Sequence, residues 1–218
     1  MCDGVIFDVD GTLLDSMPVW NKAGVQYLAQ LGIRAEAGLS EKLFALTLEE
    51  SARYIQTAYH VPHEIRTITA GINDLIMQAY AQAIPFKAGA AELLASLAEH
   101  DVPFAAATAS DRCIVEAAFR RLGVLGLFRG IITAGETGCG KDRPDMYIAA
   151  AGMLGTAPGC TWVFEDALHA ARTARSAGFK VAAVFDETSR ASWPVLSALA
   201  DYRVRTAGDF KDFICMLS

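Results

Sequence analysis

The spacing of hydrophobic positions changes once near the start of the chain, from strand-like to helical. Residues 5–7 read Val-Ile-Phe, a short continuous apolar run that is typical of a parallel strand buried on both faces. From Val19 to Leu31, apolar side chains recur at helical spacing with polar residues between them, the pattern of an amphipathic helix. Gly32 follows and suits the end of that helix.

Helical patterns continue from Ser16 to Ala83, and no clear strand interrupts them. The sequence Thr-Leu-Glu-Glu at residues 47–50 fits a capping box, in which the acid stands three residues after the threonine. The dipeptide Val61-Pro62 breaks the pattern once. The predicted helices cover residues 19–31, 40–46, 47–59 and 64–83. The sequence therefore predicts an all-helical insert directly after the first strand.

Strands and helices alternate in the remainder of the chain, after a short linker that begins at Ile84 and Pro85. Such alternation predicts right-handed crossovers and an α/β fold with a mainly parallel sheet. The predicted strands cover residues 102–107, 130–134, 161–164, 180–184 and 202–204. Helices are predicted at residues 91–99, 113–122, from Pro144 onward, at 167–177, around 193–199 and at the end of the chain.

Two acids follow the first strand. Asp8 and Asp10 stand there with Val9 between them, and Gly11 comes next. Burying two carboxylates without a partner is costly, so their position favours a nearby cation such as a metal ion. The competing interpretation is a strand that simply ends in a polar turn.

Three later strands also end in residues that suit a phosphate or metal site. Thr108 ends one strand, Glu165 and Asp166 end another, and Lys141 follows a third. Open α/β sheets bind ligands at the carboxyl ends of their strands, so we expect these side chains to lie together. Thr108 as a helix cap and Lys141 as a solvated surface residue are the alternatives.

Residues 135–142 read Gly-Glu-Thr-Gly-Cys-Gly-Lys-Asp, a near match to the phosphate-binding P-loop of nucleotide-binding proteins. Asp142 stands where the pattern needs a hydroxyl side chain, and its carboxylate would repel phosphate. Pro144 is predicted in the first helical turn, which places Lys141 before the helix. A P-loop is therefore disfavoured.

The string Asp-Val-Asp-Gly-Thr-Leu at residues 8–13 resembles the first motif of the haloacid dehalogenase-like superfamily of phosphohydrolases. Thr108, Lys141 and the pair Glu165-Asp166 resemble its second, third and fourth motifs, in the same order. The third motif usually has a proline directly after the lysine, and here Asp142 stands instead. In this superfamily an all-helical cap commonly follows the first motif. The resemblance extends to helical-cap members similar to β-phosphoglucomutase and phosphoglycolate phosphatase.

This resemblance implies a Rossmann-like three-layer core formed by residues 1–15 and 84–218, with an all-α cap domain at 16–83. It also implies an Mg²⁺-dependent phosphatase that hydrolyses a small phosphorylated metabolite through an aspartyl-phosphate. Asp8 would be the nucleophile, and Asp10 would be the general acid and base. The implied metal ligands are Asp8, Asp10 through its backbone carbonyl, and Asp166; the implied phosphate-binding residues are Thr108, Ala109 and Lys141. Glu165 would orient a metal-bound water.

Two alternatives stay open at this stage. Sugar phosphomutases that the chain resembles carry Lys-Asn after the second motif and an arginine in the cap. Here Asp111 and Arg112 follow Ser110, and the short loop of the cap at residues 44–47 contains no arginine. We therefore prefer a hydrolase. A catalytically silent binding protein on the same fold is the second alternative.

Composition narrows the class of partner. The 218 residues carry a net charge of −6, are 53% hydrophobic and contain no run of basic residues. Nucleic acid and anionic membranes are therefore not expected as partners, and no apolar run reaches the roughly 20 residues of a membrane span. The five cysteines are scattered, which predicts reduced thiols in the cytoplasm. We expect a monomer whose partner is a small metabolite.

Overall fold

The computed structural model describes residues 2–44 and 46–216. The chain divides into two compact units, Met1–Asp15 with Pro85–Ser218, and Ser16–Ile84. Each unit is described by itself below. Ala45, which falls in the helix predicted for residues 40–46, lies outside the described residues.

The first unit is built on a six-stranded sheet with strand order β3-β2-β1-β4-β5-β6. All neighbouring strands are parallel, which confirms the predicted α/β fold. β1 lies inside the sheet, and its last residue Phe7 is paired with Ala106 on one side and Phe164 on the other. The strands are β1 (Gly4–Phe7), β2 (Phe104–Thr108), β3 (Ile131–Thr133), β4 (Thr161–Glu165), β5 (Lys180–Val184) and β6 (Tyr202–Val204).

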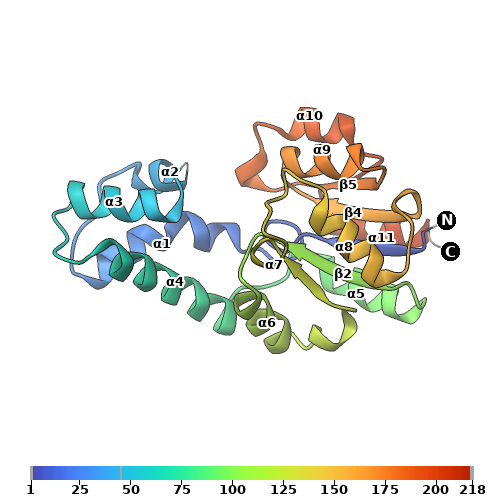
Figure 1. Cartoon of the computed structure of the whole chain (residues 1–218), viewed down its shortest axis with the longest axis horizontal. Helices are drawn as coiled ribbons and strands as arrows, with labels where there is room; N and C mark the ends of the chain where they lie inside the picture. Colours follow the sequence, from blue (N-terminus) through green and yellow to red (C-terminus); the bar gives the residue numbers. More distant parts are fainter. Residues whose placement is uncertain (1, 45, 217–218) are drawn as a thin grey trace. The chain divides into compact units, whose positions relative to one another are not determined.

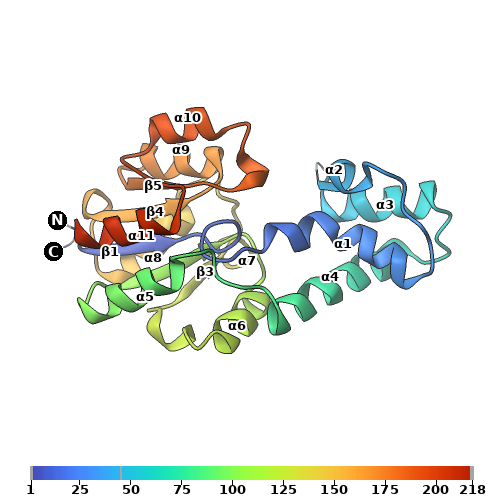
Figure 2. The same cartoon turned by 180° about the vertical axis from the view of Figure 1, so that it is seen from behind.

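Helices cover both faces of this sheet, as Figures 1 and 2 show. The helices are α5 (Ala90–Glu99), α6 (Arg112–Arg121), α7 (Ala134–Thr137), α8 (Asp145–Leu154), α9 (Leu168–Ser176), α10 (Trp193–Leu199) and α11 (Ala207–Cys215). Three short 3₁₀ turns are η1 (Leu125–Leu127), η2 (Pro158–Cys160) and η3 (Glu187–Ser189). Helix α7 overlaps the start of the segment with the near match to a P-loop and was not predicted. Helix α8 begins one residue later than expected, with Pro144 as its N-cap.

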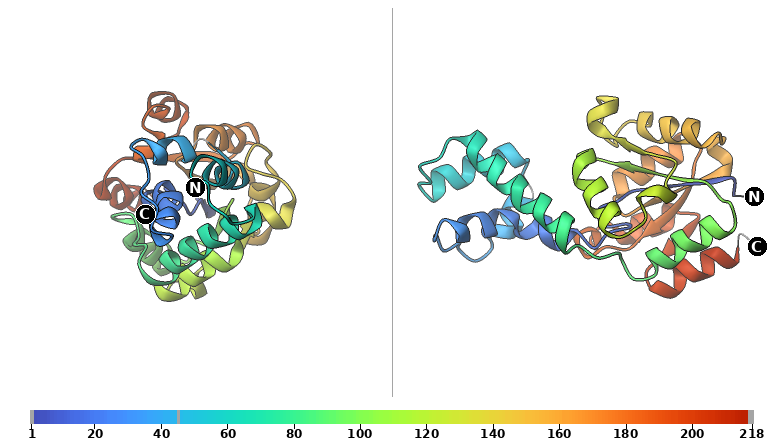
Figure 3. Two further views of the ribbon diagram at one scale, coloured as in Figure 1. Left: turned by 90° about the vertical axis from the view of Figure 1, so that its left-hand side faces the viewer. Right: turned by 90° about the horizontal axis from the view of Figure 1, so that it is seen from below.

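The pleat of the strands sorts their side chains between the two faces. Ile6 points into a cluster that α8, α9 and α10 complete with Met146, Ala171 and Leu196. Its neighbour Phe7 points to the other face. That face is aromatic, and α5 and α11 lie side by side over it (Figure 3).

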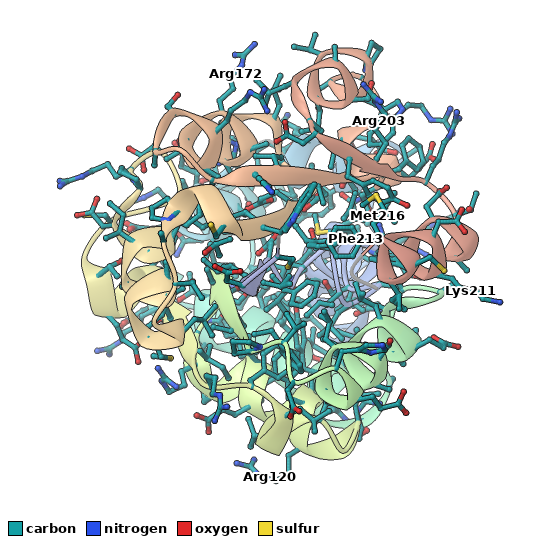
Figure 4. The ribbon with its side chains drawn as sticks, turned by 90° about the vertical axis from the view of Figure 1, so that its right-hand side faces the viewer. Arg120, Arg172, Arg203, Lys211, Phe213 and Met216 are labelled. Atoms are coloured by element: carbon teal, nitrogen blue, oxygen red, sulfur yellow. The ribbon has the colours of Figure 1, made fainter. Side chains whose placement is uncertain are left out.

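Aromatic packing joins α11 to the sheet. Phe164 lies between Phe7 and Phe213, with ring centroids 4.9 Å from each. Figure 4 shows Phe213 directed toward the sheet, whereas Arg120 and Lys211 extend outward from the periphery. Aromatic pairs at this spacing add about 0.5–1.5 kcal/mol to the burial of their surface. The central strands are therefore held firmly on both faces.

The second unit contains four helices, α1 (Met17–Gln30), α2 (Leu39–Phe44), α3 (Leu48–Ala58) and α4 (Ile65–Gln82). Thr47 and Glu50 form the predicted capping box at the start of α3. Helices α1 and α4 approach closely because Gly71 leaves room for Tyr27; a Cβ at Gly71 would lie 2.4 Å from the Tyr27 ring. No strand occurs among the described residues of this unit, in agreement with the sequence prediction.

Candidate active site

The parallel order of β2, β1 and β4 brings the carboxyl ends of these strands together. Asp8 follows β1 directly, and its backbone N–H donates to the Phe164 carbonyl at 3.0 Å. Thr108 is the last residue of β2, and Glu165 is the last residue of β4. Three of the predicted motifs therefore meet at one edge of the sheet.

A buried acidic cluster occupies this edge. Carboxylate oxygens of Asp8, Glu165 and Asp166 lie within 4.8 Å of one another, and all three residues are buried. The Lys141 ammonium group pairs with both Asp8 and Glu165. Three ionised carboxylates and one ammonium group give the cluster a net charge of −2. Carboxylate oxygens are the ligands that Mg²⁺ prefers, so the donor set and its charge fit a divalent cation.

The electrostatics of the cluster reflect this imbalance. Burial, followed by the charge of Glu165, raises the pKa of Asp8 well above its usual range, although Lys141 acts in the opposite direction. Burial and the charge of Glu165 also raise the pKa of Asp166 to about 7. A cation at the cluster would favour the ionised form of both carboxyl groups.

The Asp166 carboxylate is held by the turn after β1. The Thr12 hydroxyl donates to Asp166 Oδ1 at 3.1 Å. Gly11 has a φ of +77°, and a Cβ at this residue would lie 2.7 Å from Asp166 Oδ2. Glycine is therefore required twice, for its backbone conformation and for the close approach of the acid.

Glu165 is completely buried and holds Lys141. Besides its pair with the ammonium group, it accepts a hydrogen bond from the Tyr147 hydroxyl at 2.9 Å. The backbone N–H groups of Asp166 and Ala167 donate to its other oxygen at 3.0 and 3.2 Å. These contacts make Glu165 an orienting group for Lys141, a role that the sequence interpretation did not include.

Asp10 lies near the acidic cluster, where its charge acts on Asp8, and it contacts the loop after β2. Its Oδ2 accepts a hydrogen bond from the Ser110 hydroxyl at 2.6 Å. The Ser110 backbone N–H donates to Thr108 Oγ1 at 3.0 Å, and Ala109 between them is exposed. The hydrogen bond from Ser110 links the side chain of Asp10 to the loop after β2.

Lys141 does not have the surroundings of a P-loop lysine. Helix α7 ends at Thr137, and α8 begins at Asp145, four residues after Lys141. The lysine side chain instead enters the acidic cluster. The disfavoured P-loop is therefore excluded by the local fold.

Three residues of this region were not identified from the sequence. No site role was assigned to Ser110 or to Tyr147 from the sequence. Lys87, whose ammonium group reaches the Gly11 carbonyl at 2.7 Å, carried no motif at all. The contacts of these residues join positions far apart in the chain, and no spacing rule would have found them.

Comparison with known proteins identifies the family of this chain. The family of haloacid dehalogenase-like hydrolases matches residues 2–178, and the chain belongs to this family. The family predicted from the four motifs is thereby confirmed.

Several relatives are named as phosphatases. The chain is 33% identical to a probable pseudouridine-5'-phosphatase of Drosophila melanogaster, with 93% of this chain and 92% of the relative covered. It is 30% identical to hexitol phosphatase A of Escherichia coli, with 84% and 83% covered. Among solved structures, a putative β-phosphoglucomutase from Thermotoga maritima has a TM-score of 0.86 at 19% identity, with 99% and 100% covered. This last likeness supports the fold.

Proposed function

We propose that this chain is an Mg²⁺-dependent phosphatase that hydrolyses a small phosphorylated metabolite through an aspartyl-phosphate intermediate. The observation that carries the proposal is the buried cluster of three carboxylates around one ammonium group, at the end of β1 and β4. A bound Mg²⁺ would offset the repulsion between the nucleophile and the phosphate dianion.

In the first step, a carboxylate oxygen of Asp8 attacks phosphorus, and the bond from phosphorus to the ester oxygen breaks. Asp10 donates its proton to the departing alcohol. In the second step, water attacks phosphorus and releases inorganic phosphate, while Asp10 accepts the proton of that water. Asp8 leaves as a carboxylate, so the enzyme returns to its starting state. The hydrogen bond from Ser110 orients Asp10 for both transfers.

The remaining site residues stabilise charge on the transferring group. Lys141 is held by Asp8 and Glu165, and an ammonium group there can also contact a phosphoryl oxygen. Thr108 and the backbone of Ala109 provide neutral donors beside Asp10, at the start of the loop that leads to α6. A site built from rigid strand ends keeps these donors in place without reorganisation.

We propose that the helical residues 16–83 form the cap that chooses the substrate. Caps that close over a reaction exclude water and complete the site. The relatives are named for phosphate esters of a nucleoside and of hexitols, so these two classes of phosphomonoester are the first candidates. All five cysteines are free thiols in the structure, which supports a cytoplasmic location. No helix in the described part of the chain is both long and apolar enough to cross a membrane.

The geometry favours hydrolysis over the mutase alternative. Arg112 is one of the two residues that stand where the mutases carry Lys-Asn, and it could bind a second phosphate only if its guanidinium group were available. Its guanidinium instead pairs with Glu136 at 2.6 Å and donates to the Ile131 carbonyl at 2.5 Å. The other position is the acid Asp111, which would repel a second phosphate.

Phosphate release from a panel of nucleoside and hexitol monophosphates tests the proposal. Wild-type protein should release phosphate with Mg²⁺ and lose this activity with a chelator. The Asp8→Asn variant should lose at least about a thousandfold in kcat, because an amide cannot form the intermediate. Asp101→Asn is the matched control, because Asp101 is exposed and precedes β2 at the opposite end of the sheet.

Release that persists in Asp8→Asn would contradict the mechanism. If wild-type protein releases no phosphate from any ester, the mutase and silent alternatives gain weight. Isomerisation of a sugar phosphate in the presence of its bisphosphate then separates those two.

A further inference from the structure

Lys87 is a partly buried lysine that no motif of the family resemblance includes. Its ammonium group donates to the Gly11 carbonyl at 2.7 Å, to the Phe185 carbonyl at 2.8 Å and to Asp186 Oδ2 at 2.7 Å. An ammonium group has three N–H donors, so these contacts use all of them. The side chains of Lys87 and Asp186 are only 15% and 6% exposed, and their geometry is therefore closely determined.

Asp186 is fixed independently of Lys87. Its other oxygen accepts hydrogen bonds from the Thr188 backbone at 2.9 Å and from the Thr188 hydroxyl at 2.6 Å. Burial alone would raise the pKa of Asp186, but hydrogen bonds from Lys87 and Thr188 lower it below its ordinary value. Asp186 is therefore a fixed anion at the end of β5, and it gives Lys87 a rigid anchor.

The contact of Lys87 with the Gly11 carbonyl links this lysine to the candidate active site. Gly11 lies between Asp10 and Thr12, and it packs directly against Asp166. The Lys87 backbone N–H also donates to the Leu13 carbonyl at 2.8 Å. Lys87 thus holds the turn after β1 at two points, with its side chain and with its backbone.

We propose that Lys87, which Asp186 pairs with, is a positioning residue that holds the Asp10–Thr12 turn in its reactive geometry. The part of this inference that is tested by kcat rests on the proposed phosphatase function. The ammonium group holds the carbonyl of Gly11, the residue between Asp10 and Thr12. Thr12 in turn donates to Asp166 through its hydroxyl. A displacement of about 1 Å in such a support can cost about a hundredfold in rate.

Three variants separate positioning from stability. Lys87→Met removes the donor to Gly11 and leaves Asp186 buried without its cation. Asp186→Asn keeps Lys87 on both carbonyls. The double variant removes the unpaired charge but still lacks the donor to Gly11, so it is the variant that keeps a stable fold if Lys87→Met does not.

We expect the three variants to rank differently in stability and in kcat. In urea, Lys87→Met should be the least stable variant, and the double variant should recover part of the loss. In kcat at saturating Mg²⁺, both variants that lack Lys87 should fall about tenfold or more, while Asp186→Asn should fall less than about threefold. KM should change less than about threefold in all of them, since the turn acts on the reacting groups.

Hydrogen–deuterium exchange gives a readout that needs no substrate. The Gly11 amide donates to the Leu14 carbonyl, and the Leu14 amide donates to the Val9 carbonyl; both amides report on the turn. Their exchange should accelerate in Lys87→Met and in the double variant. Arg190→Met is the matched control, because it removes an exposed ion pair with Glu187 just after Asp186 and should change neither readout.

The inference is overturned if the double variant keeps wild-type kcat and wild-type exchange in residues 9–14. It is also overturned if kcat falls only in proportion to lost stability across the three variants. If wild-type protein has no phosphatase activity, the proposed function fails, and exchange alone decides whether Lys87 holds the turn.

Discussion

The two units of this protein use polar side chains in opposite ways. In the α/β unit, a few charged groups are buried and joined to each other, as Lys141 is to Asp8 and Glu165. In the helical unit, the ion pairs between Arg53 and Glu49 and between Arg66 and Glu64 are exposed. Buried charges are costly unless each has its partners, so their presence marks where the chemistry lies.

Polar contacts inside the helical unit are neutral by comparison. Trp20 donates to the Tyr80 hydroxyl at 2.7 Å, and the Tyr27 hydroxyl lies 2.9 Å from His63 Nδ1. Such hydrogen bonds join helices, and the loss of one lowers the free energy of unfolding only modestly. We therefore expect substitutions at the carboxyl ends of the strands in the α/β unit to lower the reaction rate. Substitutions in the helical unit should mainly affect stability or substrate choice.

The largest difference in kcat is expected between substitutions at two glycines that both have a left-handed backbone conformation. Gly11 and Gly38 have φ values of +77° and +83°, but only Gly11 has Asp166 within 4 Å of an added Cβ. Gly11→Ala should lower kcat by about a hundredfold, because the acid must move. Gly38→Ala should cost about 1 kcal/mol of stability and leave kcat unchanged. Steady-state kinetics and urea unfolding measure both; equal losses of kcat would contradict the comparison.

A second pair of variants compares a buried acid with an exposed one. Glu165→Gln should lower kcat about thirtyfold or more, because Lys141 loses one of its two anionic partners. Glu49→Gln should leave kcat unchanged and lower stability by less than about 1 kcal/mol, because its pair with Arg53 is exposed. The measurement is kcat at saturating Mg²⁺. A Glu165→Gln enzyme with full activity would show that Lys141 needs no orienting partner.

The acidic cluster should also make metal binding depend on pH. Burial and Glu165 raise the pKa of Asp166 to about 7, so without metal this group stabilises the fold below its unfolded pKa. That contribution is lost as pH rises through about 7. Mg²⁺ binds the ionised form, so it should raise Tm more near pH 8 than near pH 5. Thermal unfolding with Mg²⁺ and with chelator measures this, and an equal rise at both values would refute it.

The smallest effect is expected at Trp20. Trp20→Phe keeps an aromatic ring but removes the donor to Tyr80, which should cost about 1 kcal/mol of stability. Tyr80→Phe removes the same hydrogen bond from the other side, so the pair forms a double-mutant cycle. Urea midpoints measure the coupling between the two residues. Additive losses would show that the bond contributes nothing by itself.

Much of the α/β unit could be predicted from the sequence because its signals are local. The apolar run at residues 5–7 and the strands at 180–184 and 202–204 lie where their patterns placed them. The acids Asp8 and Asp166 were identified because each stands at the end of a buried run. Their closeness followed from one rule about parallel sheets.

What the sequence by itself determined is the alternation of strands and helices, the family, and which acids stand at strand ends. Only the tertiary structure decided that Glu165 holds Lys141, that Ser110 orients Asp10 and that Lys87 reaches the turn. These contacts join residues 24, 100 and 76 positions apart. The physical reason is that periodicity and turn chemistry act over a few residues, whereas a buried charge takes its partners from whichever segments the folded chain brings beside it.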